Sequence, residues 1–323
     1  MTETMIESKR VTHLIEGSAL LDQPSAGLLI LTGADRADFL HRMTTNEINR
    51  LQVGRATVTV LTSSTARILQ TFTVLCREDG LWLLPAPDQA ANLARHLQGQ
   101  IFFMDQVKVQ NAGADYHRLR LMGPTTAQVL AAAGLAVDEL AAEQWDERVV
   151  AGETIVVLKQ ERYAVPGFEL IVPVAALPTL QTQLQTAGAV AMDETAYAEQ
   201  RIALGRPAPG HELTDAYNPL EAGLGWACAD DKGCYTGQEI IARQITYDKI
   251  TKSLVGLHSD ELLAVGQDLT VDGRAVGTVT SSVVSAALGP IALAIVKRPH
   301  NEPGTQLQAG SHNVQVVALP FVA

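Results

Sequence analysis

The spacing of apolar and polar residues predicts an α+β body followed by a β-rich C-terminal part. Short runs of apolar and β-branched residues alternate with longer segments in which apolar residues recur every three or four positions. The first pattern is typical of strands and the second of amphipathic helices packed on one face of a sheet, so together they predict two sandwiches of the βαβ type. Strands are expected at residues 27–32, 57–61, 68–75, 81–84, 153–159 and 168–172, and helices at residues 36–43, 88–97, 174–186 and 193–204.

An internal repeat supports this duplication. Residues 119–130 repeat residues 29–40 at an offset of 90 positions, with Leu, Leu, Gly, Ala and Leu in register. In each copy a buried strand ends at a glycine and is followed by a helix, for which Asp35 is a candidate N-cap in the first copy. The repeat predicts one supersecondary unit that is used twice.

The character of the chain changes after residue 252. A long loop rich in Gly and Pro, residues 207–229, is expected to be functional, because loops of that length are uncommon inside compact domains. Short strands separated by turns then predict a small β-barrel or sandwich, with a domain boundary near residues 247–252. These strands are expected at residues 253–258, 268–271, 275–284, 291–296 and 313–318.

Composition and charge narrow the functional classes. The 323 residues, of which 47% are apolar and 18% charged, are enough for about two domains with real cores. A net charge of −11 argues against general binding to nucleic acid or to an anionic membrane, since both need an excess of Lys and Arg over a surface. The polar N-terminus MTETMIESKR lacks an apolar signal core and no 18-residue apolar run occurs, which predicts a cytoplasmic protein.

Cysteine and histidine spacing argues against a protein-bound metal. Cys76, Cys228 and Cys234 cannot form a fully paired disulfide framework, and the five residues between the last two match neither redox pairs nor common zinc sites. The eight histidines form no H-x-x-x-H or H-E-x-x-H pair, so we expect them to be surface or structural residues.

The stretch K-G-C-Y-T-G-Q-E at residues 232–239 concentrates candidate chemistry. Lys232 lies two residues before Cys234, and glycines 233 and 237 flank the cysteine. A nearby ammonium favours the thiolate, and glycines allow positive φ or close approach to a ligand, so the stretch predicts a reactive thiol. Two structural alternatives stay open: a glycine-rich turn that caps a helix starting near Gly237, with Cys234 inert, and a Lys232 that only pairs with Asp230 or Asp231.

With R-I-A-L-G at residues 201–205 and N-P-L-E-A-G-L at residues 218–224, this motif resembles the YgfZ folate-binding family. That family is related to the aminomethyltransferase, or T-protein, of the glycine cleavage system and to factors that act late in iron–sulfur cluster assembly. The resemblance covers the whole chain in element order, from G-A-D-R-A-D-F-L-H-R-M-T-T-N-E-I near Gly33 to the C-terminal barrel. Only the K-G-C-Y-x-G-Q-E motif within it is highly specific.

The resemblance implies an aminomethyltransferase-like ring of three domains with tetrahydrofolate in the central hole. Two ferredoxin-like α+β modules and a C-terminal β-barrel would form the ring. The implied division is a discontinuous folate-binding domain of residues 1–50 and 115–245, a second α+β domain of residues 51–114, and a barrel of residues 246–323.

Site residues follow from the same resemblance. Glu169 in G-F-E-L is the implied carboxylate for the pterin, whose amino group and ring N–H offer two adjacent donors; the alternative is a solvated strand residue. Arg201 would hold a folate carboxylate or order the pocket, unless it is a helix-surface charge. Tyr235 and Gln238 are further implied cofactor contacts, and Cys234 with Lys232 the implied reactive pair at the rim of the folate hole.

One departure from the aminomethyltransferase pattern bears on activity. Those enzymes resemble this chain around residues 66–72 but carry an Asp-Asp pair where Gln70 and Thr71 stand here. A neutral side chain cannot serve as a carboxylate base, which argues against aminomethyl transfer.

Three functional hypotheses therefore remain open. The first is a tetrahydrofolate-binding accessory protein for iron–sulfur cluster assembly or repair, which acts on client proteins through Cys234. The second is a folate-dependent one-carbon transferase that moves a methyl or aminomethyl group. The third is a non-catalytic folate sensor or scaffold.

Overall fold

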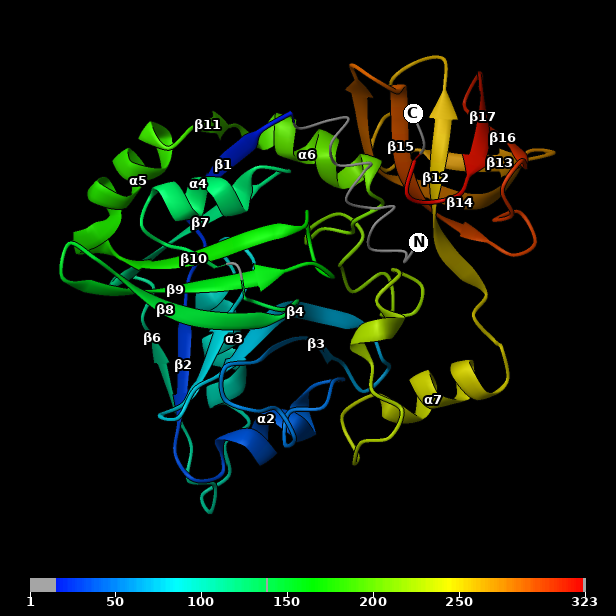
Figure 1. The fold of residues 1–323 in the computed structure, drawn as a ribbon. Helices are drawn as coiled ribbons and strands as arrows, with labels where there is room; N and C mark the ends of the chain where they lie inside the picture. The colour runs from blue at the N-terminus through cyan, green and yellow to red at the C-terminus, as the bar shows by residue number, and fades with distance from the viewer. Residues whose placement is uncertain (1–15, 138, 322–323) are drawn as a thin grey trace.

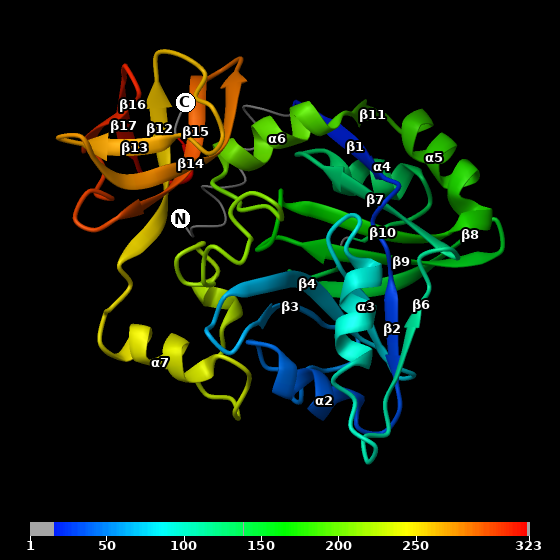
Figure 2. The same ribbon diagram turned by 180° about the vertical axis from the view of Figure 1, so that it is seen from behind.

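A computed structural model describes residues 16–137 and 139–321, which form two stacked α+β modules and a separate barrel (Figure 1). The N-terminal stretch MTETMIESKR lies outside the described residues. Two β-sheets pack face to face, and helices cover the outer face of each sheet, which gives a four-layer body (Figures 1 and 2). The α+β body with a C-terminal barrel that the hydropathy pattern predicts is confirmed.

The first sheet has six strands in the order β11-β1-β7-β10-β9-β8. Leucines 119 and 121 of β7 and Leu170 of β10 face outward onto helices α4 and α5, because alternate residues of a strand point to opposite faces. The members of this module are β1 (Ser18–Gln23), β7 (Tyr116–Met122), α4 (Thr126–Ala132), β8 (Gln144–Val150), β9 (Glu153–Gln160), β10 (Gly167–Pro173), the 3₁₀ turn η1 (Val174–Ala176), α5 (Leu177–Thr186) and β11 (Ala189–Met192).

The second sheet has five strands in the order β3-β4-β5-β2-β6. Phe72 and Val74 of β4 pack under helices α2 and α3, while Leu75 on the opposite face meets Ile171 and Val156 of the first sheet. The members of this module are β2 (Leu29–Thr32), α2 (Arg36–Met43), β3 (Ala56–Thr62), β4 (Ile68–Cys76), β5 (Leu81–Leu84), α3 (Ala90–Gln98) and β6 (Lys108–Asn111).

The C-terminal strands close into a six-stranded barrel in the order β12-β15-β14-β13-β16-β17. Helix α6 packs on it, with Ile202 and Ala203 against Ile291 and Leu293. The long loop then leads through η2 (Gly225–Ala227) to α7 (Gln238–Thr246) and the barrel. The remaining elements are α6 (Glu194–Ala203), β12 (Lys252–Ser259), β13 (Asp268–Val271), β14 (Arg274–Ser285), β15 (Gly289–Lys297), β16 (Gln306–Ala309) and β17 (His312–Val317).

The two copies of the sequence repeat have the same local structure, one in each module. Gly33 after β2 has φ +105°, and Gly123 after β7 has φ +110°. Both conformations are in the region that glycine tolerates without strain, and a helix begins three residues later in each copy. The shared glycine is therefore explained by the turn that it permits.

Some predictions about the modules need correction. The pairs among the described strands are antiparallel apart from β1 with β11, which is the one parallel pair that the term βαβ implies; hairpins and short connections favour antiparallel neighbours. Asp35 occupies the N-cap position of α2 but makes no cap bond, because its carboxylate accepts from the backbone N–H of Gln106 at 2.8 Å. Asp193 does cap α6, through Ala196 N at 2.8 Å.

The sequence-based division into domains stays a prediction. It assigns residues 29–43 to the discontinuous domain, whereas in the structure β2 pairs with β5 and β6 of the second sheet. We therefore propose that the module built on the second sheet begins near residue 28.

Candidate functional site

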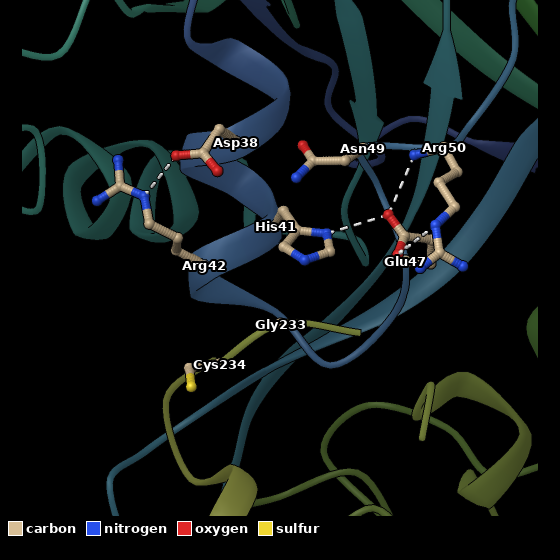
Figure 3. A pocket seen from close by; sticks show the side chains of 8 residues that line it. All are labelled: Asp38, His41, Arg42, Glu47, Asn49, Arg50, Gly233 and Cys234. Atoms are coloured by element: carbon tan, nitrogen blue, oxygen red, sulfur yellow. Dashed lines mark hydrogen bonds and ion pairs between the residues drawn. The ribbon is translucent and has the colours of Figure 1, made fainter. Parts of the chain in front are cut away.

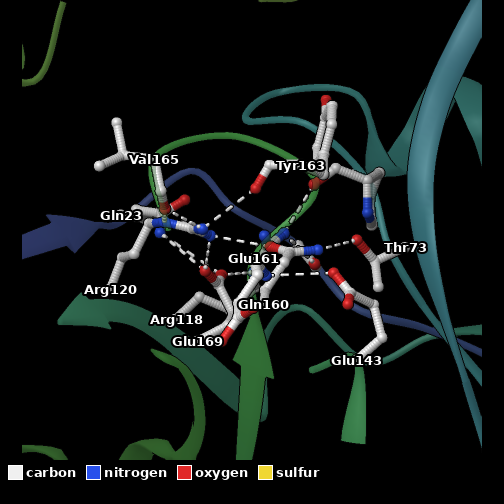
Figure 4. A network of polar contacts seen from close by, with 12 residues as sticks. Gln23, Thr73, Arg118, Arg120, Glu143, Gln160, Glu161, Tyr163, Val165 and Glu169 are labelled. Atoms are coloured by element: carbon white, nitrogen blue, oxygen red, sulfur yellow. Dashed lines mark hydrogen bonds and ion pairs between the residues drawn. The ribbon is translucent and has the colours of Figure 1, made fainter. Parts of the chain in front are cut away.

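A buried network of two arginines and one glutamate occupies the inner face of the first sheet (Figure 4). Arg120 on β7 is the direct register partner of Glu169 on β10, and Arg118 lies on the same face two residues earlier. Arg118 donates from Nε to Glu169 Oε1 at 2.6 Å, and Arg120 donates from Nη1 to Glu169 Oε2 at 2.9 Å. Glu169 is only 1% exposed, so the two guanidinium groups offset the free-energy cost of burying its side chain.

Neighbouring groups hold both guanidinium groups in place. Arg120 also donates to the backbone oxygen of Val165 and, at 2.9 Å, to Gln160 Oε1. Gln160 in turn donates to Thr73 Oγ1 at 2.7 Å, which ties the first sheet to β4 of the second. Arg118 donates to the carbonyl of Pro85 at 2.6 Å. The network is therefore connected across both modules, which fixes the side chains before any ligand arrives.

This network forms one wall of a cavity of about 470 Å³, here called the central cavity. The opposite wall comes from α6 and the start of the long loop, next to the barrel. The central cavity thus lies where two modules and the elements that contact the barrel meet, a common location for ligand sites. Its lining includes Gln23, Thr73, Arg118, Arg120, Gln160, Tyr163, Tyr197, Arg201, Arg206 and His211.

Strand β4 carries two buried polar atoms without a partner, one on each face of the strand. Thr71 Oγ1 and Gln70 Oε1 are buried and have no hydrogen-bond partner among the described residues. Thr71 lies two positions before Thr73, so both hydroxyls are on the same face of the strand, and Thr73 lines the central cavity. A buried polar atom without a partner is costly unless a ligand or water satisfies it.

Arg201 links α6 to the barrel. Its guanidinium donates to Glu212 at 3.3 Å and to Ser281 Oγ of β14 at 2.8 Å, and Ser281 donates to Glu212 at 2.6 Å. Arg201 is 5% exposed, so the alternative of a helix-surface charge is wrong. These contacts support the predicted role of Arg201 in ordering the cavity that it lines; a bond to a folate carboxylate stays a prediction.

Glu169 is likewise buried and charge-paired, which rules out a solvated strand residue. Both of its oxygens are engaged by arginines, and the arginines rather than Glu169 line the central cavity. The geometry therefore indicates that Glu169 positions Arg118 and Arg120. A direct bond from Glu169 to a pterin stays a prediction.

Lys232 holds the K-G-C-Y-T-G-Q-E stretch against the end of α2. Its ammonium donates to the carbonyl oxygens of His41, Thr44 and Asn46 at 2.7, 2.5 and 2.8 Å. Burial lowers the pKa of Lys232 to about 8, an effect that the nearby Glu47 opposes. Neither Asp230 nor Asp231 is the partner of Lys232; Asp231 pairs with Arg50 at 2.9 Å.

The three carbonyl bonds use all three N–H donors of Lys232, so none is left for the Cys234 sulfur. The prediction that Lys232 activates Cys234 therefore rests on its charge alone. Cys234 itself is exposed, in contrast to Cys228, whose burial raises its pKa to about 11.

Cys234 lines a second cavity of about 500 Å³, here called the thiol cavity, between α2 and the loop after it (Figure 3). The described residues that line it are Asp38, His41, Arg42, Glu47, Asn49, Arg50, Gly233 and Cys234. None of them lines the central cavity. The structure therefore separates Cys234 from the arginine network, whereas the sequence-based hypothesis put the thiol at the rim of the folate hole.

Tyr235 and Gln238 also lie away from the central cavity. The ring of Tyr235 is buried against Ala66 and Ile241, with the Lys232 ammonium 4.8 Å from its centroid, and burial raises its pKa. Gln238 is the first residue of α7. Both residues lie in or next to the turn that carries Cys234. Their contact with a cofactor stays a prediction.

Substitution of Gly237 tests how tightly the turn that carries Cys234 is packed. It has φ +84°, and an added Cβ would lie 2.7 Å from Ser63 O. Gly54 has φ +83° but open space around it. We expect Gly237→Ala to lower the free energy of unfolding by about 2–4 kcal/mol, and Gly54→Ala by about 1 kcal/mol, because only the first adds a clash to the backbone strain. Urea unfolding of both variants measures the difference, and equal losses would contradict the tight packing of this turn.

Sequence reasoning missed the arginines of the network. The signal was present, since Arg118 and Arg120 alternate with Leu119 and Leu121 in an otherwise apolar strand. Charged residues at alternate positions of a buried strand indicate an inward-facing polar site.

The described residues offer neither a metal site nor a membrane-spanning helix. No group of three or more His, Cys, Asp or Glu side chains is placed to hold a metal ion in residues 16–137 and 139–321. In the same residues no helix is long and apolar enough to cross a membrane.

The architecture matches a solved aminomethyltransferase. The structure of the glycine cleavage system aminomethyltransferase T from Bartonella henselae superposes with a TM-score of 0.86, covers 98% of this chain and 89% of that one, and shares 22% sequence identity. The two proteins therefore have the same fold.

Sequence comparison identifies the family. The GCVT N-terminal domain matches residues 4–232, and the glycine cleavage T-protein C-terminal barrel domain matches residues 252–322. The chain therefore belongs to the GCVT family, whose aminomethyltransferases use tetrahydrofolate.

Two relatives illustrate the breadth of that family. A Natronomonas pharaonis protein named as an aminomethyltransferase is 31% identical, over 98% of this chain and 91% of that protein. A chloroplastic protein of Arabidopsis thaliana, named as a transferase, is 30% identical over 95% of this chain and 72% of that protein.

Proposed function

We propose that this chain binds a reduced folate in the central cavity and acts as an accessory factor in iron–sulfur cluster assembly or repair. In this role it would be a YgfZ-type member of the GCVT family that works in the cytoplasm. Its action would fall on client proteins and not on a free metabolite.

The observation that carries the folate part is the preorganised polar wall of the central cavity. Arg118 is held by Glu169 and by the carbonyl of Pro85, and its Nη2 has no hydrogen-bond partner among the described residues, so it needs no rearrangement to meet a polar ligand. All five N–H donors of Arg120 are used by protein oxygens, so Arg120 keeps the wall in shape. A volume of about 470 Å³ suits a small organic molecule.

Other lining groups fit a reduced folate. The rings of Tyr163 and Tyr197 offer flat surfaces for a pterin or a benzoyl ring. The unpaired hydroxyl of Thr71 beside the cavity offers one more donor or acceptor. Arg206 and His211 line the cavity as well and would suit the carboxylates of the folate tail.

Two observations favour an accessory role over group transfer. By the family resemblance, Gln70 and Thr71 stand where the aminomethyltransferases carry an acidic pair, and neither side chain can supply the carboxylate that such chemistry would use at this position. Cys234 adds an exposed thiol that lines a cavity of its own. We propose it as the reactive residue that meets a client, with Lys232 holding its loop.

A client would need a surface to bind. Phe102, Phe103 and Met104 are 65%, 97% and 74% exposed at one loop tip. Asp105 in this loop pairs with Arg42, which lines the thiol cavity, at 2.9 Å. Exposed apolar clusters of this kind mark protein contact sites.

A one-carbon transferase is the second candidate. The Natronomonas pharaonis relative, named as an aminomethyltransferase, aligns with nearly the whole chain, and that favours shared chemistry. A folate sensor or scaffold without catalysis is the third, and it would require that Cys234 be dispensable. Unchanged client iron–sulfur activities in cells that carry Cys234→Ser would support this third version.

Titration calorimetry with tetrahydrofolate tests the shared basis of these hypotheses. We expect binding, and we expect Tyr197→Ala to weaken it by about 3- to 10-fold, because an aromatic contact is worth about 0.5–1.5 kcal/mol. Tyr247→Ala is the matched control, since Tyr247 is 66% exposed and does not line the central cavity. Wild-type protein that binds no reduced folate would overturn the proposal.

A further inference from the structure

The thiol cavity contains a second titratable group next to Cys234. The side chain of His41 on α2 is only 8% exposed, and it lines the cavity (Figure 3). A Cβ on Gly233 would lie 3.5 Å from His41 Nε2, so this nitrogen faces the residue just before the cysteine. In Figure 3 the sulfur of Cys234 points away from the ring, so the reaction proposed below requires the Cys234 side chain to rotate toward His41.

The other ring nitrogen of His41 faces a carboxylate. Nδ1 accepts from the backbone N–H of Ile48 at 3.4 Å in one tautomer of the ring, and in the other it donates to Glu47 Oε1, which lies 3.2 Å away. We assign the second tautomer, with the imidazole proton on Nδ1, because the contact with the carboxylate is shorter and charge-assisted. Nε2, which has no hydrogen-bond partner among the described residues, is then left with a free lone pair toward the cavity.

The charges around His41 support this neutral form. Burial, and after it the ammonium of Lys232, lowers the pKa of His41, while Glu47 and Asp38 oppose the shift. Near neutral pH the ring is therefore able to accept a proton.

We propose that the thiol cavity is a thiol–disulfide exchange site in which His41, oriented by Glu47, is the general base for Cys234. The inference deepens the proposed role of Cys234, on which it rests. His41 Nε2 takes the proton from the Cys234 thiol, and the thiolate attacks one sulfur of a disulfide R–S–S–R. A Cys234–S–S–R bond forms, the R–S⁻ group leaves, and it takes the proton back from Nε2. No further oxidant or reductant is required.

The lining indicates the class of disulfide. Two carboxylates, Asp38 and Glu47, and two guanidinium groups, those of Arg42 and Arg50, line the cavity as two ion pairs, Asp38 with Arg42 and Glu47 with Arg50. Such a balanced set matches a small zwitterionic disulfide that carries both ammonium and carboxylate groups, and it disfavours ligands of a single sign.

The test measures the rate at which oxidised glutathione modifies the full-length protein, with the Cys234 peptide followed by mass spectrometry over pH 5 to 9. We expect His41→Gln to slow the reaction at pH 7 by about tenfold or more and to remove the rise in rate over the range where an imidazole titrates. Glu47→Gln keeps the imidazole and should shift that rise in pH. His96→Gln, which alters a histidine of α3 outside the cavity, is the control.

Unchanged rates and pH profiles in both variants would overturn the role of His41. If His41→Gln fails to fold, the pH profile of the rate in Glu47→Gln decides whether His41 is the base.

Cystamine, with two positive charges, and dithiodiglycolate, with two negative charges, test the class of disulfide that the cavity accepts. Equal rates for these two and for oxidised glutathione would overturn the proposed class. Tetrahydrofolate binding by the same variants should not change, because the described residues share no member between the two cavities. A failure of the folate proposal is therefore separable from a failure of this one.

Discussion

Glu169→Ala is expected to cost about 3–5 kcal/mol of unfolding free energy. The substitution removes the carboxylate that pairs with two arginines at 2.6 and 2.9 Å, in a place where Glu169 is 1% exposed. Buried charges that lose their partner are penalised far more than exposed ones, because water cannot replace the missing interaction. Urea unfolding measures the loss.

An exposed ion pair whose glutamate lies in the same sheet as Glu169 is the matched control. Glu147 on β8 pairs with Arg77 at 2.7 Å, but its side chain is 43% exposed. Glu147→Ala should therefore cost no more than about 1 kcal/mol. A loss at Glu169 as small as that at Glu147 would contradict the view that the network depends on its carboxylate.

The same substitution should also weaken tetrahydrofolate binding, although Glu169 does not line the central cavity. Arg118 and Arg120 line it, and they would lose the partner that fixes their orientation. Glu169→Gln, which keeps the shape but drops the charge, should be intermediate in both stability and binding. Full affinity in a folded Glu169→Ala protein would mean that the arginines need no such support.

Formation of methylene-tetrahydrofolate from candidate aminomethyl donors is expected to be at least about 100-fold slower than with an aminomethyltransferase of this family. The reason is that a positioned acid or base contributes about 10²–10⁴ in rate, and Gln70 and Thr71 are neutral. Robust turnover by the wild-type chain would overturn the accessory role and establish the transferase.

Introducing an acidic residue into strand β4 makes the test of aminomethyl transfer more specific. Thr71→Asp and Gln70→Asp place a carboxylate where polar atoms are already buried without partners. We expect Thr71→Asp to raise the rate, because Thr71 shares a face of β4 with Thr73 of the central cavity, whereas Gln70 lies on the opposite face. Leu69→Asp is the control on the same strand, because Leu69 is 42% exposed. A rise in rate with Leu69→Asp equal to that of Thr71→Asp would show that position does not matter.

Much of the fold followed from local patterns. Strands β3, β4 and β5, the capped helix α6 and the Asp272–Gly273 turn into β14 were predicted because each depends on nearby residues. The missed strands are β1, β6, β8, β11 and β16, most of them short or weakly alternating. Such segments become strands because a neighbouring strand offers its hydrogen bonds, which is a property of the assembled sheet.

The residues of the candidate sites could be predicted from the sequence less completely than the fold. The motif directed attention to Cys234 and Lys232, and the family resemblance to Glu169 and Arg201. Arg118, Arg120 and His41 were not predicted, since nothing in their local sequence tells which side chain they will meet. Glu169 and Arg120 are separated by 49 positions, and Lys232 and His41 by 191.

By itself, then, the sequence determined the order of elements, the duplicated strand–glycine–helix unit and the barrel. Tertiary structure alone decided the partners of the charged groups: Lys232 bonds to carbonyls and not to a carboxylate, and Glu169 holds two arginines. It also placed Cys234 and His41 in the lining of one cavity, which is distinct from the central cavity. The physical reason is the range of the interactions. Periodicity and turn conformation are set within a few residues, whereas a buried charge is stabilised by whichever groups the packed chain brings within about 3 Å of it.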